Sequence, residues 1–138
     1  MLVSSKYPFI ILLDTSTCIF LLRGKRSVEE KLNTIDEDSC YITDVVVAEL
    51  FFGAYYSDRT EENIRQVEAF VTEMNVIPFS ETIGTFAQER ARLWKAGKKI
   101  EDFDLLIGCA AKARGLTVVT HNRKHFEHIE GLLIEDWV

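Results

Sequence analysis

Long hydrophobic runs are missing from this chain. A membrane-spanning helix needs about 20 consecutive apolar residues, and no apolar run in the sequence reaches that length. The apolar run at residues 9–13 is short and ends at Asp14, which makes it a poor match to a secretion signal. We therefore expect a protein without membrane contact that works in the cytoplasm.

Cysteine is also scarce. Cys18, Cys40 and Cys109 are odd in number and far apart, and no two of them form a C-x-x-C pair. This pattern favours small, buried apolar side chains in a reducing compartment over a disulfide or a zinc site.

An excess of positive charge is absent as well. The sequence has 16 Lys and Arg against 22 Asp and Glu, a net charge of −6, whereas nucleic-acid-binding proteins are usually basic. Acidic residues gathered at a metal site can hide a local basic patch, so net charge alone does not exclude nucleic acid. Basic clusters occur at residues 23–26 and 95–99, and each is more typical of a solvated surface.

Internal repeats, low-complexity tracts and linkers are not found either. The length of 138 residues fits one domain with a sizeable core, and 47% hydrophobic residues is ordinary for a globular protein. We therefore predict a single domain over residues 1–138.

What the sequence does contain is an alternation of short apolar runs and longer helical segments. Strands are predicted at residues 9–13, 40–43, 75–79, 116–119 and 132–134. Helices are predicted at residues 16–22, 28–35, from 44 onward, 60–74, 80–97 and 103–114, with Ser16 and Asp102 among their caps. This alternation predicts an α/β fold, with a mostly parallel central sheet flanked by helices on both faces.

Polar residues follow several of these strands, and ligands of such sheets bind at the carboxyl ends of the strands. Asp14 directly follows the first strand, and Glu49 lies about one and a half turns into the helix after the second. Residues 120–122, Thr-His-Asn, follow the strand at 116–119. Asp104 lies in the first turn of the helix before that strand, and this helix runs antiparallel to the strands. We therefore expect four distant segments to converge at one edge of the sheet.

The convergence would gather three carboxylates, those of Asp14, Glu49 and Asp104, with no basic residue nearby in the sequence. Like charges within a few ångströms repel unless a divalent cation neutralises them. Oxygen-only ligands favour Mg²⁺ or Mn²⁺. A metal would also explain why Glu49 is the one charged residue in VVVAELFFGAYY, residues 45–56, because a buried isolated carboxylate is unfavourable.

Each acid also has a structural interpretation. Asp14 could only cap a helix, and Asp104 could only complement the positive end of its helix dipole. Glu49 could form a buried ion pair with Arg90 or Arg92. The combination of the three acids favours a metal site more than any one of them does.

Histidines and aromatic residues are less informative. His121, His125 and His128 have a spacing that allows a transition-metal site, but no Cys or Glu ligands stand near them in a known spacing, so surface positions are favoured. The aromatic residues within 51–56 are assigned to core and oligomer contacts rather than to base stacking.

Three stretches of the chain resemble a known family. They are LLDTSTCIFLL (12–22), ITDVVVAELFFGA (42–54) and DFDLLIGCAAKARGLTVVTHNRKHFEHIEGLLIEDW (102–137). In order and spacing they resemble PIN-domain ribonucleases, and specifically the VapC-like toxins of bacterial and archaeal toxin–antitoxin pairs. The last stretch is the most specific, with its D-x-L-I helix, V-T-x-N turn and terminal Trp137.

The resemblance implies a PIN-domain fold, RNA cleavage that depends on Mg²⁺ or Mn²⁺, a homodimer, and inhibition by a cognate VapB-like antitoxin. By position, the family's metal-binding acids correspond to Asp14, Glu49 and Asp104. The family often has a fourth acid where this chain has Asn122, which weakens a second metal position. The polar residues that support the acids correspond to Thr15 or Ser16 and to Thr120.

In this interpretation Asp14 and Asp104 hold the principal metal ion, and Glu49 binds it or orients the attacking water. Arg23, Lys25 and Arg26 are expected to hold RNA phosphates.

Two other functions compete with this one. A phosphatase of the haloacid dehalogenase type needs a second Asp two residues after the first, where this chain has Ser16. The other is a catalytically silent PIN-like module that binds RNA or a protein partner. All three acids are present, which favours activity.

Overall fold

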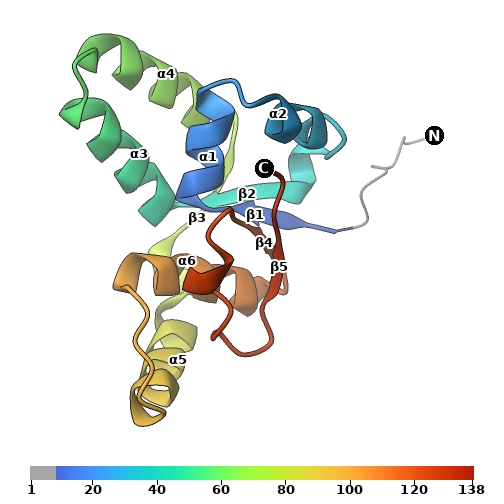
Figure 1. Ribbon diagram of the computed structural model, residues 1–138, viewed down its shortest axis with the longest axis vertical. Coiled ribbons are helices and arrows are strands. Elements are labelled where there is room, and N and C mark those ends of the chain that lie inside the picture. Colours follow the sequence, from blue (N-terminus) through green and yellow to red (C-terminus); the bar gives the residue numbers. More distant parts are fainter. Residues whose placement is uncertain (1–8) are drawn as a thin grey trace.

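The computed structural model describes residues 9–138, in which helices surround a central sheet (Figure 1). The strands are β1 (Ile11–Leu13), β2 (Cys40–Thr43), β3 (Asn75–Ile77), β4 (Thr117–Val119) and β5 (Leu133–Glu135). The α-helices are α1 (Thr15–Leu22), α2 (Arg26–Leu32), α3 (Asp44–Tyr56), α4 (Thr60–Thr72), α5 (Ile83–Lys95) and α6 (Asp102–Arg114). The 3-10 turns are η1 (Glu37–Ser39), η2 (Phe79–Glu81) and η3 (Arg123–His125). All strand pairs are parallel, in the order β3-β2-β1-β4-β5, which confirms the predicted α/β class.

Helix starts differ from the sequence-based assignment. Ser16 does not cap the first helix, because Asp14 is the N-cap and its side chain accepts a hydrogen bond from the backbone N–H of Thr17 at 2.8 Å. Similarly, α6 begins at Asp102 itself and Glu101 occupies the cap position. Several residue types can cap a helix, so the choice between neighbours depends on the path of the preceding chain.

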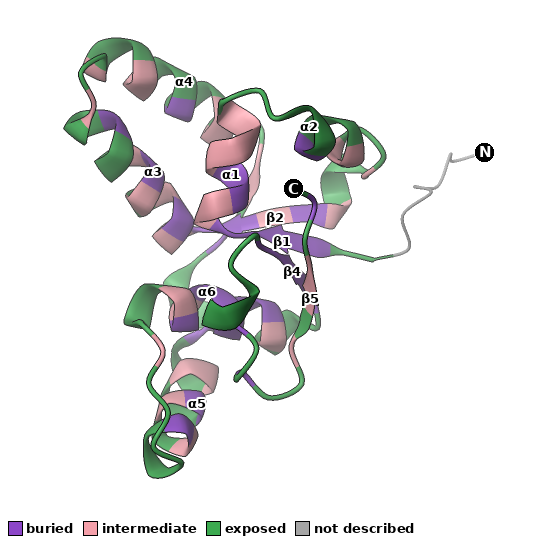
Figure 2. Ribbon diagram, viewed as in Figure 1, coloured by how far each residue is buried: buried purple, intermediate pink, exposed green. Residues whose placement is uncertain are grey.

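The two faces of the sheet are covered by different helices. In Figure 1, α1 to α4 lie above the sheet and α5 and α6 lie below it. The middle strand β1 is fully buried between these layers (Figure 2). Strands covered on both faces have near-continuous apolar sequences, which is why the short runs predicted them well.

Helix α3 is less buried than its apolar sequence suggests. Its buried positions recur every four residues and are Val46, Leu50 and Ala54. Phe51 packs against the core, whereas Phe52, Tyr55 and Tyr56 are largely exposed, Tyr56 at 83%. Of the core and oligomer contacts expected for the aromatic residues within 51–56, the core contact is made by Phe51, whereas oligomer contacts of the three exposed residues stay a prediction. Glu49 therefore lies on a helix with one solvent-exposed face, not in a fully buried segment.

The chain between β4 and β5 packs closely on α6. Phe126 and Ile129 of this segment are buried, and an added Cβ on Gly108 of α6 would lie 2.3 Å from the Ile129 Cδ1 atom. The absence of a side chain at Gly108 thus permits the close approach. As a result, η3 lies beside the start of α6.

No helix within residues 9–138 combines the length and the apolar character needed to cross a bilayer. Cys18, Cys40 and Cys109 are free and buried, as the sequence predicts. Burial raises the pKa of Cys40 and of Cys109 to about 12, so these thiols stay protonated at neutral pH.

Candidate active site

The candidate site lies at the carboxyl edge of the sheet, between β1 and β4. The chain passes from β1 to β2 and β3 toward one edge and then returns to β4 on the other side of β1. This reversal is a switch point, where a parallel α/β sheet leaves a crevice for ligands. Asp14 stands at the end of β1, and its backbone N–H donates to the Val119 carbonyl of β4 at 3.1 Å.

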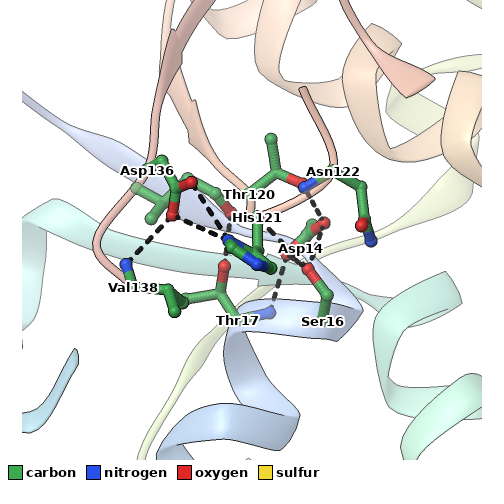
Figure 3. Close-up of polar contacts among 9 residues, drawn as sticks. Asp14, Ser16, Thr17, Thr120, His121, Asn122, Asp136 and Val138 are labelled. Atoms are coloured by element: carbon green, nitrogen blue, oxygen red, sulfur yellow. Dashed lines mark hydrogen bonds and ion pairs between the residues drawn. The ribbon is translucent and has the colours of Figure 1, made fainter. Parts of the chain in front are cut away.

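Asp14 is buried and hydrogen-bonded through both carboxylate oxygens (Figure 3). Its Oδ1 accepts from the backbone N–H of Thr17 and from the Ser16 hydroxyl, both at 2.8 Å. Its Oδ2 accepts from the Thr120 hydroxyl at 2.5 Å. The Thr120 oxygen accepts in turn from the backbone N–H of Asn122 at 2.9 Å. Capping is thus only one of the contacts of Asp14, and neutral donors from two chain segments fix its orientation.

Glu49 reaches the same edge from α3. Its Oε1 accepts a hydrogen bond from the Thr15 hydroxyl at 2.5 Å, which ties α3 to the first turn of α1. Burial raises the pKa of Glu49 above its ordinary value, and the Thr15 bond opposes that rise. The negative charges of Asp104, Glu101 and Asp14 raise this pKa further.

Asp104 completes the group from the first turn of α6. The Nδ1 atom of His125, on η3, lies 3.0 Å from its Oδ2. Burial raises the pKa of Asp104, His125 lowers it, and the charges of Glu101 and Asp14 raise it. The carboxylates of Asp14, Glu49 and Asp104 are therefore close enough to interact electrostatically. The sequence analysis expected these three acids to converge at one edge of the sheet.

Two members of the site were missed from the sequence. Glu101 adds a fourth negative charge that raises the pKa of both Glu49 and Asp104. His125 is exposed, as the sequence analysis expected, but its contact with Asp104 was not foreseen. The three acids in the run Glu101-Asp102-Phe103-Asp104 could have indicated the extra negative charge of Glu101. The contact of His125 with Asp104 is revealed only by the packing of η3 on α6.

The alternative ion pair for Glu49 is not found. Arg92 instead binds Glu89, with an Nη2 to Oε2 distance of 2.8 Å, and the guanidinium of Arg90 lies 3.6 Å from Asp102. Glu49 is therefore held by a hydroxyl group rather than by a cation.

The histidines do not gather at one metal ion. His121 Nδ1 lies 3.1 Å from Asp136 Oδ2, and His128 Nδ1 lies 3.5 Å from the Lys98 ammonium. Together with the His125–Asp104 pair, these contacts place the three histidines on separate partners, as expected for surface positions.

The remaining predicted residues take different places. The Asn122 side chain is exposed beside Asp14 and Ser16 (Figure 3), and its amide makes no hydrogen bond within residues 9–138. Arg23 follows α1 and lines a hollow of about 210 Å³ that Glu49 also lines. Lys25 and Arg26 lie at the start of α2, and their contact with RNA stays a prediction.

As they are placed, no three His, Cys, Asp or Glu side chains within residues 9–138 are close enough together to enclose a metal ion. The donor set is nonetheless the one that Mg²⁺ prefers, because the acids offer only carboxylate oxygens and Mg²⁺ usually keeps several waters while binding few carboxylates. Burial raises the pKa of Glu49 and of Asp104, and the negative charges of neighbouring carboxylates raise both further. A divalent cation would neutralise those charges. The residues present therefore fit such an ion.

The chain is similar to known proteins. The PIN domain family model matches residues 11–132. The chain is 38% identical to the tRNA(fMet)-specific endonuclease VapC of Shigella flexneri over 91% of this chain and 96% of that protein. It is 36% identical to the tRNA(fMet)-specific endonuclease VapC of Salmonella typhimurium, over the same shares.

A solved structure agrees. In the crystal structure of DNA-bound VapBC from Salmonella typhimurium, one chain is 34% identical and superposes with a TM-score of 0.87, covering 94% of this chain and 99% of that one. The family match, the relatives and the shared fold agree with the acids at the switch point: the chain belongs to the PIN-domain family and, within it, to the VapC ribonucleases.

Proposed function

We propose that this chain is an endoribonuclease that uses Mg²⁺ or Mn²⁺ and serves as the toxin of a toxin–antitoxin pair. The observation that carries the proposal is that Asp14, Glu49 and Asp104 approach the switch point from three distant segments, close enough for the charge of Asp14 to raise the pKa of both Glu49 and Asp104. Hydroxyl groups orient two of these acids, so their negative charge is kept for a cation.

Asp14 and Asp104 would hold the ion, and Glu49 would join them or face the attacking water. When bound, a divalent ion lowers the pKa of water and stabilises charge on a phosphodiester. The Glu49 carboxylate could accept the proton that the attacking water loses.

Supporting residues hold this geometry without adding charge. The Thr120 hydroxyl fixes Asp14, and the Thr15 hydroxyl fixes Glu49. Asn122 stands at the rim as a neutral donor that can reach a scissile phosphate. Ser16 donates to Asp14 at 2.8 Å, where a haloacid dehalogenase would need a second carboxylate, so that phosphatase chemistry is not supported.

The substrate would be RNA, and tRNA(fMet) is the first candidate because the relatives from Shigella flexneri and Salmonella typhimurium carry that specificity in their names. The partner would be a VapB-like antitoxin, since the Salmonella structure is of a VapBC complex. An antitoxin segment would fit the hollow along α1, α3 and α4, which is lined by Leu50, Gly53, Ala54 and Val67 and reaches Glu49.

Purified protein should cut RNA in Mg²⁺ or Mn²⁺ and stop in EDTA. Asp14→Ala should abolish cutting while far-ultraviolet circular dichroism keeps the parent spectrum. Cleavage by this variant at the parent rate would mean that a contaminating nuclease or another site is responsible. Binding of RNA without cleavage by the parent would favour the catalytically silent module.

A further inference from the structure

One side of the acid cluster is basic, although the chain as a whole has a net charge of −6. A hollow of about 220 Å³ begins at Asp104 and Glu101 and is walled on its other side by Lys99, Lys124, His125 and His128. Figure 1 shows why these residues meet: the segment after β4 lies against α6, beside the loop that joins α5 to α6. Two segments about 25 residues apart thus supply the basic wall.

The lysines of this wall differ from the cations around them in their charge pairing. Most cations on the neighbouring helices are paired: Arg90 with Asp102, Arg92 and Lys112 with Glu89, and Arg114 with Glu81. By contrast, no ion pair in residues 9–138 involves Lys98, Lys99 or Lys124, which are all exposed.

Their positions are nevertheless constrained. The Lys99 ammonium lies over the Trp94 ring at 5.9 Å from its centroid, and Lys98 contacts His128 at 3.5 Å. A cation over an aromatic face is attracted to the ring, which limits the range of Lys99. Lys124 is set by η3, which the close packing of the segment on α6 holds in place.

The basic wall also continues toward the other side of the acids. A second hollow, of about 440 Å³, is lined by Asn122, Arg123, Lys124 and His125, together with His121 and Glu127. Lys124 and His125 line both hollows, so a continuous band passes from Asn122, beside Asp14, to Lys99. Glu101 and Glu127 are the acids outside the metal-binding group that face this band.

The hollow on the opposite side of the acids has a different character. It runs along α1, α3 and α4, and apart from Glu49 and Arg23 its lining is neutral, with Ile19, Leu22 and Leu50 among its apolar residues. A polyanion would therefore gain electrostatic attraction mainly from the side of η3 and the α5–α6 loop.

We propose that Lys99 and Lys124 hold the phosphates of RNA nucleotides next to the scissile bond, along the band from Asn122 to Lys99. This inference rests on the proposed function, because it assigns a binding role on the substrate of the same site. The contacts are to the backbone, so they supply affinity and register rather than base specificity. The band is a second basic surface beside Arg23, Lys25 and Arg26, whose contact with RNA stays a prediction.

The test compares two doubly neutralised variants, Lys99→Gln/Lys124→Gln and the matched Arg59→Gln/Arg65→Gln, whose residues lie at α4 and have no predicted role in the site. Both remove two positive charges from exposed positions, so the net charge changes equally. Binding of a 3′-fluorescein single-stranded RNA of about 12 nucleotides is measured by anisotropy in EDTA, at several salt concentrations. Cleavage of the same RNA in Mn²⁺ gives kcat and KM.

For single strands each phosphate contact contributes about 0.7 to the slope of log K against log salt. Losing two contacts should flatten the slope by about 1.4 and weaken binding about 25-fold at 0.1 M salt. In Lys99→Gln/Lys124→Gln, KM should rise while kcat stays within about twofold of the parent, because the acids are untouched. The matched variant should keep the parent slope and KM.

The outcomes separate this inference from the proposed function. A parent that cuts, with Lys99→Gln/Lys124→Gln unchanged in slope and KM, would overturn the inference alone. Equal losses in both variants would overturn it too, because the effect would then be one of net charge. A parent that binds but never cuts, with the loss confined to Lys99→Gln/Lys124→Gln, would overturn the proposed function and support the band. A parent that neither binds nor cuts would overturn both.

Discussion

Glu89 offers a stability test whose magnitude follows from the structure. It is only 4% exposed and lies on α5. Its carboxylate accepts from Arg92 at 2.8 and 3.1 Å, from Lys112 of α6 at 3.0 Å and from the backbone N–H of Glu130 at 3.2 Å. The residue therefore joins α5, α6 and the segment that carries η3.

These contacts lower the pKa of Glu89 from 4.5 to about 2, with the Arg92 hydrogen bonds as the largest cause and burial opposing them. A difference of that size corresponds to about 3.4 kcal/mol at neutral pH. The Arg92 and Lys112 side chains are 38% and 31% exposed, so solvent screens part of this energy. We expect Glu89→Gln to lower the free energy of unfolding by about 2 kcal/mol at pH 7.

The pH dependence has a defined sign. A carboxyl group with a lowered folded-state pKa stabilises the protein above its unfolded pKa, and this stabilisation is lost as pH falls from about 4.5 toward 2. The difference in the free energy of unfolding between parent and variant should therefore be largest at pH 7 and smaller at pH 3. The other carboxyl groups titrate in both proteins, so their contributions cancel in this difference. Urea unfolding followed by tryptophan fluorescence measures it.

The matched control is Glu81→Gln, which breaks the exposed pair with Arg114. Its cost should stay within about 0.5 kcal/mol, because exposed pairs contribute little. The reasoning fails if Glu89→Gln costs no more than this control, or if its cost is the same at pH 3 as at pH 7.

Three further predictions concern the site and the assembly. The exposed aromatic residues Phe52 and Tyr56 predict a homodimer, and a monomer by light scattering at about 50 µM would contradict it. Thr120→Val removes the hydroxyl at nearly constant volume and should cost about 1–2 kcal/mol in urea unfolding, because buried Asp14 loses a donor; unchanged stability would show that the bond is dispensable. Asp104→Asn relieves like-charge repulsion, so in EDTA the variant should have a higher melting temperature than the parent. In Mg²⁺ or Mn²⁺ this difference in melting temperature should become smaller or change sign, because the parent gains more stability from metal binding. If Mg²⁺ or Mn²⁺ leaves the melting temperature of the parent unchanged, the acids do not bind the ion. If the variant is less stable than the parent in EDTA, Asp104 has a structural role beside His125.

The sequence was sufficient for the fold class and for much of the site because both depend on local patterns. Short apolar runs mark strands covered on both faces, and the rule for parallel sheets then places Asp14 and Asp104 at one edge. Helix ends were less predictable. Asp14 and Ser16 are both good caps, and only the backbone path out of β1 selects Asp14.

The parts that were missed depend on contacts between distant segments. His125 meets Asp104 because the segment after β4 packs on α6 where Gly108 leaves room, and no local spacing reveals that contact. The solvent-exposed face of α3 around Glu49 was missed for a related reason. A helix that is apolar on all sides suggests full burial, but only one face of α3 meets the core and the other faces solvent.

The choice of partners for the acids has a consequence for the ion. An arginine beside Glu49 would have neutralised its charge and removed the attraction for a divalent cation. Thr15 and Thr120 instead orient Glu49 and Asp14 through neutral hydroxyl groups, which fix the oxygens and leave their negative charge in place. His125 differs, because when protonated it competes with an ion for Asp104. The cations of the site are thus kept to one flank, where they can attract a polyanion without cancelling the charge that a metal requires.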